Sequence, residues 1–292
     1  MARIPRHTQL CAVLCAHVAA GCTATDSKSA TDSAASPTAA VAPAARANTV
    51  NFTARDFAFE GPDSIPAGLT AFHLTNAGKE LHHIQLVKLD QGKTFADIQA
   101  NVNAGGGRQP WTIPYGGVNP PEPGESTTAM QVLEPGNYAI ICAVEGADHI
   151  RHFTKGMLKG LTVTASPNAN MTEPTADVTL TLSDFAFTLS KPLVAGKQMI
   201  KVENAAAQSH EVLLVQLQPG KTVGDLAKWA LDKQGPSPGR SIGGIPGFRK
   251  GQITYFEATL EPGDYAMICF VRDAKDGKPH FAHGMAQQFK VS

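Results

Sequence analysis

The stretch LEPGNYAIIC at 133–142 recurs as LEPGDYAMIC at 260–269. Each copy contains a proline–glycine turn, a short apolar run typical of a strand, and one cysteine at its end. After nine and ten residues, respectively, a second shared motif follows, HFTKGM at 152–157 and HFAHGM at 280–285. Glycine weakens helices and frees the backbone, so this motif predicts a loop between two strands.

The similarity between the two halves extends well beyond these motifs. RDFAF at 55–59 matches SDFAF at 183–187, and GGV at 116–118 matches GGI at 243–245. The stretch NAGKELHHIQLVKLDQGKT matches NAAAQSHEVLLVQLQPGKT at the same spacing. A repeat over this length predicts two duplicated domains, 48–166 and 175–292, joined by a linker at 167–174.

Within each half the sequence pattern favours β-structure. TVNFTARDFAF and DVTLTLSDFAF alternate apolar and polar residues, as half-buried strands do, and about seven short strands are expected per half. One stretch per half indicates a helix, 94–102 and 222–234, because each opens with a threonine that can cap it. We therefore expect an all-β protein of two tandem β-sandwich domains, each with a short helical insertion.

The N-terminal region predicts export. Residues 1–22 have a basic start and a short apolar run at 10–21, and no run in the chain is long enough to span a membrane. The run ends at Cys22, which resembles the cysteine of a bacterial lipobox, and plain signal-peptide cleavage is the alternative. Residues 23–47, rich in alanine, serine and threonine, predict a disordered tether. We expect a periplasmic or cell-surface protein, anchored to a membrane through lipid at Cys22.

Composition excludes some partners. The chain has 292 residues, with 25 basic and 25 acidic side chains, and this balance argues against a nucleic-acid partner. Five cysteines are present, of which three precede residue 23, so each half keeps one. One cysteine per half does not build a disulfide scaffold.

Each half carries two histidines, one cysteine and one methionine in matching places. These residues are His82, Cys142, His152 and Met157 in the first half and His210, Cys269, His280 and Met285 in the second. Two imidazoles, a thiolate and a weak thioether suit copper, whereas zinc more often takes further cysteines or carboxylates and calcium takes oxygen. Taken singly, each residue is more simply explained by packing or hydrogen bonding, so a packing motif is the alternative.

These motifs resemble those of cupredoxins, the blue-copper family that includes plastocyanin, azurin and multidomain relatives. The resemblance rests on an early histidine after a turn, then PG-x-Y-x-x-x-C, a variable loop and H-x4-M, in both halves. It implies a Greek-key sandwich with one type 1 copper per half, two coppers per chain, in which the methionine is a long axial ligand. The sequence departs from the family after the first histidine, where asparagine is common and His83 and Glu211 stand instead.

The flanks of the two cysteines bear on catalysis. Multicopper oxidases and nitrite reductases of this family connect the type 1 site to a second copper through a histidine beside the cysteine. Here the preceding residues are Ile141 and Ile268, and the following ones are Ala143 and Phe270. We therefore expect no enzyme activity.

The function expected from the sequence is electron transfer by copper, with a redox partner protein that the sequence does not identify. If His152 and His280 face solvent at the rim, they are the expected exits for the electron. Two alternatives remain open: copper storage, delivery or sensing without a redox role, and a copper-free binding or assembly module.

Overall fold

Alternating burial along the first strand shows how the sequence builds the sheets. In the computed structural model, which describes residues 47–167, 169 and 172–292, Val50, Phe52 and Ala54 of Asn48–Arg55 face the core. The residues between them are more exposed, as the period of two predicts. Burying a side chain such as Phe52 contributes roughly 1.5–3 kcal/mol.

The first half contains nine strands, one α-helix and one short 3₁₀ turn. They are β1 (Asn48–Arg55), β2 (Ala58–Glu60), β3 (Ser64–Pro66), β4 (Gly68–Asn76), β5 (Ile84–Leu89), α1 (Phe95–Asn103), β6 (Thr112–Val118), β7 (Ser126–Leu133), β8 (Gly136–Ile141), η1 (His152–Lys155) and β9 (Leu158–Thr164).

The second half repeats this order with eight strands. They and the helical elements are β10 (Val178–Ser183), β11 (Ala186–Leu189), β12 (Gly196–Asn204), β13 (His210–Leu217), α2 (Val223–Asp232), β14 (Gly239–Phe248), β15 (Ile253–Leu260), β16 (Gly263–Ile268), η2 (His280–His283) and β17 (Ala286–Val291). The all-β class and both helical insertions are confirmed.

Both sheets run through the two halves. The first sheet has the order β11-β10-β12-β15-β7-β4-β1-β2, and the second has the order β17-β16-β13-β14-β6-β5-β8-β9-β3. Non-consecutive neighbours such as β5 and β8 are antiparallel, which gives the crossed connections of a Greek key.

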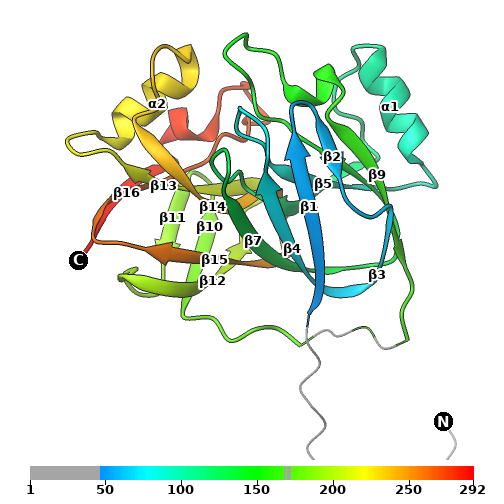
Figure 1. Ribbon diagram of the computed structural model, residues 1–292, viewed down its shortest axis with the longest axis horizontal. Coiled ribbons are helices and arrows are strands. Elements are labelled where there is room, and N and C mark those ends of the chain that lie inside the picture. The colour runs from blue at the N-terminus through cyan, green and yellow to red at the C-terminus, as the bar shows by residue number, and fades with distance from the viewer. Residues whose placement is uncertain (1–46, 168, 170–171) are drawn as a thin grey trace, which may run out of the picture. The chain divides into compact units, whose positions relative to one another are not determined.

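The halves meet through strand pairing. Strands β7 and β15 lie side by side (Figure 1). In their register Phe256 lies opposite Ala129, and β6 pairs with β14 where Phe248 lies opposite Tyr115. The side-chain amide of Gln85 also donates to the Gly247 carbonyl at 2.8 Å. The described residues from 47 to 292 form one compact unit, and the division into domains 48–166 and 175–292 stays a prediction.

One apolar cluster contains residues of both halves, among them the two cysteines and the two candidate methionines. The helices pack outside it: Ile98 of α1 and Leu226 of α2 each join a smaller cluster. Each helix begins at a threonine that forms a capping box with an aspartate, Thr94 with Asp97 and Thr222 with Asp225. The candidate cysteines and methionines therefore lie in the main apolar core.

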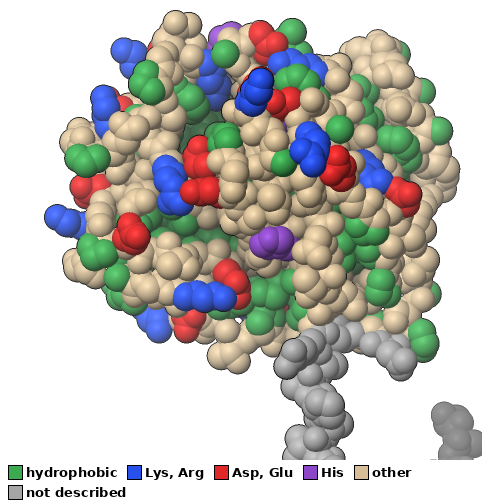
Figure 2. Space-filling model, in the orientation of Figure 1, with side chains coloured by type: hydrophobic (Ala, Val, Ile, Leu, Met, Phe, Trp, Pro, Cys, Tyr) green, Lys and Arg blue, Asp and Glu red, His purple; other side chains and the backbone are tan. Residues whose placement is uncertain are grey.

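One face of the molecule carries charged side chains of both signs. Figure 2 shows acidic and basic side chains interspersed on the visible face. Among the described residues, helices stay too short and too polar to cross a bilayer. The predicted signal, the tether up to residue 46 and the lipidation site Cys22 lie outside the described residues.

Candidate metal centres

In the first half, three predicted ligands converge in the core. His82 lies just before β5, Cys142 follows β8, and His152 begins η1. The Nδ1 atoms of His82 and His152 are 3.1 Å apart, and the Cys142 sulfur lies 3.5 Å from Nδ1 of His152. None of the three side chains is exposed to solvent, and their ligand atoms all lie within 4.8 Å of one another.

The second half repeats this arrangement. His210 opens β13, Cys269 follows β16, and His280 begins η2. Nδ1 of His280 lies 2.9 Å from Nδ1 of His210 and 3.5 Å from the Cys269 sulfur. All three side chains are fully buried. Two equivalent His–Cys–His groups are therefore present in the described chain.

The two methionines lie next to these groups along the backbone. The Cys142 N–H donates to the Met157 carbonyl at 3.1 Å, and the Met157 N–H donates to the His152 carbonyl at 3.0 Å. In the second half, the Cys269 N–H donates to the Met285 carbonyl and the Met285 N–H donates to the His280 carbonyl, both at 3.1 Å. Gly156 and Gly284, each at φ 102°, provide the left-handed residue that turns the chain back. Both methionines are fully buried, and their role as axial ligands stays a prediction.

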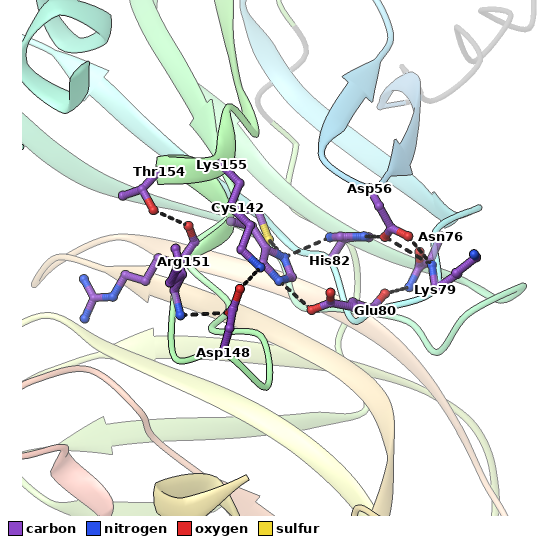
Figure 3. A network of polar contacts seen from close by, with 12 residues as sticks. Asp56, Asn76, Lys79, Glu80, His82, Cys142, Asp148, Arg151, Thr154 and Lys155 are labelled. Carbon is purple, nitrogen blue, oxygen red and sulfur yellow. Dashed lines mark hydrogen bonds and ion pairs between the residues drawn. The ribbon is translucent and has the colours of Figure 1, made fainter.

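The first group requires a cation between its two histidines. Nε2 of His82 lies 2.5 Å from an Asp56 oxygen, and Nε2 of His152 lies 3.0 Å from a Glu80 oxygen. A carboxylate only accepts hydrogen bonds, so both imidazoles donate from Nε2. Both Nδ1 atoms then present lone pairs to each other, and a proton or a metal ion must lie between them. Figure 3 shows Asp56 and Glu80 with His82 and Cys142.

The protonation preferences of the ligands also fit a metal. Burial raises the pKa of the Cys142 thiol to about 12 and raises that of Cys269 well above its usual value. Burial lowers the pKa of His280 to about 4 and lowers that of His210 as well. Neutral imidazoles can bind a metal directly, while a thiol buried this deeply ionises only if a cation replaces its proton.

The donor set identifies that cation. Two imidazole nitrogens and one thiolate, with a buried methionine next to them along the backbone, suit copper better than zinc or the oxygen-seeking cations. Both groups fit copper, two sites per chain.

Two aspartates that hold the first histidines were missed by the sequence analysis. Asp184 lies 3.0 Å from Nε2 of His210, as Asp56 lies 2.5 Å from that of His82. Such carboxylates fix the imidazole orientation and raise its basicity as a ligand. Both belong to the repeated RDFAF and SDFAF motifs, so the repeat was the signal that could have identified them.

The next residue of the same motif covers each site. The Phe57 ring packs against His152 with centroids 4.8 Å apart, and Phe185 packs against His280 at 5.2 Å. Lys155 lies over Phe57, and His283 lies against Phe185. The condition under which His152 and His280 would be the electron exits, that they face solvent at the rim, is not met, because both side chains are fully buried.

The residues after the first histidines fix the cysteine loops. Nε2 of His83 accepts from the Ala143 N–H at 2.9 Å, and a Glu211 carboxylate oxygen accepts from the Phe270 N–H at 2.6 Å. Although neither is asparagine, each holds the backbone directly after its cysteine. His149, the other histidine of the first cysteine loop, is exposed and lies outside the ligand group.

Comparisons with known proteins returned structures only, since no family model and no curated protein matches the chain. Reduced auracyanin from Roseiflexus castenholzii is 19% identical, with 41% of this chain and 99% of that chain covered and a TM-score of 0.28. The blue copper oxidase from Nitrosomonas europaea is 13% identical, with 85% and 86% covered and a TM-score of 0.27. The copper nitrite reductase from Nitrosomonas europaea is 14% identical, with 85% and 94% covered and a TM-score of 0.25.

Overlaps this weak carry no weight for function. The described strands form an all-β fold of two sheets, and its two buried His–Cys–His groups fit copper.

Proposed function

We propose that this protein transfers single electrons, with one type 1 copper bound by each half. The ligands would be His82, Cys142, His152 and Met157 in the first site and His210, Cys269, His280 and Met285 in the second. The observation that carries the proposal is the buried His–Cys–His group, formed twice from matching positions. Bound copper would supply the one-electron couple between its two oxidation states.

The surrounding residues support this role by keeping the ligands in place. Asp56 and Asp184 orient the first histidines, and His83 and Glu211 hold the backbone after each cysteine. Because the ligand positions are fixed by these bonds and by burial, little rearrangement is needed when the metal changes its charge.

The residues beside the two cysteines support an electron carrier without a catalytic copper centre. Neither cysteine has a histidine neighbour through which a second copper could be connected. In the described residues, the remaining cluster of candidate ligands is Asp273, Asp276 and His283. Its carboxylates already accept backbone N–H groups, as when Asp273 receives the Lys275 N–H at 2.8 Å.

The place of action completes the proposal. An export signal, a tether at 23–47 and lipid at Cys22 would hold the two sites near a membrane on the outer side of the cell, within reach of a redox partner protein.

Copper storage, delivery or sensing is the second candidate, and one observation favours it. The second histidine of each site, His152 or His280, is buried and covered by a phenylalanine ring. An electron carrier benefits instead from a ligand imidazole that lies close to its partner protein. A copper-free assembly module is the third reading, and it would leave the paired lone pairs at His82 and His152 without a purpose.

Copper titration of the purified protein, followed by visible absorption and bound metal, tests these readings. The proposal expects an intense thiolate-to-copper band that saturates at about two coppers, a reversible one-electron couple, and loss of half the band in Cys142→Ser or Cys269→Ser. Copper bound without a reversible couple would favour storage, and no bound copper would leave a packing motif.

A further inference from the structure

The two sites differ at one ligand histidine. Nε2 of His152 lies 3.0 Å from a Glu80 carboxylate oxygen, but Nε2 of His280 is fully buried and has no hydrogen-bond partner. The residue that corresponds to Glu80 in the second half is Gln208. Each of the two lies two positions before the first histidine of its site. The first site therefore has a carboxylate on both histidines, while the second has one.

The backbone around the two positions is held in the same way. The Asn76 side-chain amide donates to the Glu80 carbonyl at 2.8 Å, and Asn204 donates to the Gln208 carbonyl at 2.9 Å. The difference between the sites thus lies in the side chains and in what faces them.

The opposite loop explains why the side chains diverge. Gln208 donates to Asp273 at 2.8 Å and accepts from the Ala274 N–H at 2.8 Å, so both its nitrogen and its oxygen bond to this loop and not to His280. In the first half, Gly146 lies against the Glu80 carboxylate, and a Cβ at Gly146 would stand 2.7 Å from Oε2 of Glu80. Because glycine leaves this space open, Glu80 can reach His152.

A carboxylate on Nε2–H makes the imidazole a stronger electron donor through Nδ1. A stronger donor stabilises the more highly charged oxidation state, Cu(II), more than Cu(I), and this lowers the reduction potential. Other charged groups also act on the sites: Lys155 acts on His152 in the first, while Glu211 acts on Cys269 and Asp273 and His283 act on His280 in the second. The order of the two potentials depends on all of them, whereas the hydrogen bond from His152 depends on Glu80 alone.

We propose that Glu80 tunes the first copper site, lowering its reduction potential through the hydrogen bond to His152, and that Gln208 leaves the second site without this effect. The inference rests on the proposed electron-transfer function. It makes the two halves inequivalent carriers despite their matching ligands.

Single-site proteins make the test possible. Cys269→Ser isolates the first site and Cys142→Ser isolates the second, and the potential of each is measured by spectroelectrochemical titration of the thiolate-to-copper band. In the first, Glu80→Gln is expected to raise the potential by about 59 mV, which corresponds to a tenfold change in the relative affinity for the two oxidation states. The band itself should persist.

Asp148→Asn is the matched control. It removes one negative charge from the neighbouring loop between β8 and η1, where Asp148, like Glu80, lies beside Gly146 but pairs with Lys155 at 2.7 Å. Its effect on the potential should be much smaller than that of Glu80→Gln. An unchanged potential in Glu80→Gln, or an equal shift in both variants, overturns the inference.

The second site supplies the converse test. Gln208→Glu replaces a hydrogen bond to Asp273 by repulsion between like charges, which favours rotation toward the free Nε2 of His280. The potential of the second site should fall. If Glu80→Gln fails to bind copper, the result for Gln208→Glu decides. An unchanged or higher reduction potential of the second site in Gln208→Glu counts against the inference. Absence of any reversible couple in both single-site proteins refutes the proposed function itself.

Discussion

Nδ1 of His210 lies 2.9 Å from Nδ1 of His280, and neither side chain has any exposed surface. The two residues are 70 positions apart, one at the start of β13 and the other at the start of η2. Buried lone-pair donors this close to each other and to a cysteine form a group that a metal ion stabilises by replacing the thiol proton.

The aspartates behind the first histidines should control copper affinity. Asp56→Asn and Asp184→Asn remove the carboxylates that accept from His82 and His210, so each should weaken copper binding at its own site by about 10–100-fold. Competition with a copper chelator measures the affinity. Asp63→Asn, at an exposed ion pair with Lys159, is the control, and equal losses in all three variants would contradict the assignment.

The phenylalanine covers should control copper release. Phe57→Ala and Phe185→Ala would open a path to His152 and His280, so transfer of copper to a chelator should become faster while the number of bound coppers stays the same. Stopped-flow loss of the thiolate-to-copper band follows the rate. Ile150→Ala, which alters an exposed side chain in the first cysteine loop, should leave the rate unchanged. Unchanged rates in the phenylalanine variants would show that copper leaves by another route.

Two glycines of the repeated GGV and GGI motifs should be intolerant of substitution. A Cβ at Gly117 or Gly244 would clash with the carbonyl of Ile84 or Val212, and both glycines have φ near +130° (129° and 127°). Gly117→Ala and Gly244→Ala should each lower the free energy of unfolding by about 1–3 kcal/mol, measured by urea denaturation. Gly124 has φ 84° and open space around it, so Gly124→Ala introduces backbone strain without a clash. It should lower the free energy of unfolding by less than the other two variants.

The residues after the first histidines should give the copper-free protein opposite dependences on pH. Burial raises the pKa of Glu211 to about 7, so the folded state binds more protons than the unfolded state between about pH 4.5 and 7. Glu211 therefore lowers stability as pH rises through this window, by on the order of 3 kcal/mol. Glu211→Gln should remove that loss in urea denaturation at a series of pH values.

His83 acts in the other direction. Burial lowers its pKa to about 4, so the unfolded state binds more protons between about pH 4 and 6.5, and stability rises with pH there. His83→Gln should flatten this rise, and the two variants should change the stability profile with opposite signs. Profiles that change in the same sense would show that burial does not control these two groups.

Much of the fold followed from the sequence because its signals are local. Alternation along 49–59 marks a strand, and Thr94 and Thr222 mark helix starts, since these patterns depend on neighbours within a few residues. The sequence did not indicate that β7 pairs with β15 or that β6 pairs with β14, because pairing between distant strands depends on the surfaces they bury together.

For the candidate sites, too, some features followed from the sequence and others only from the tertiary structure. The sequence determined the residue types, since two copies of a cysteine followed by H-x4-M are visible by inspection and predict a copper site. Only the tertiary structure decided which polar atoms meet. Asp56 reaches His82 across 26 residues and Glu80 reaches His152 across 72, and Gln208 turns instead to Asp273. Such contacts are long-range and depend on side-chain direction, which spacing along the chain does not specify.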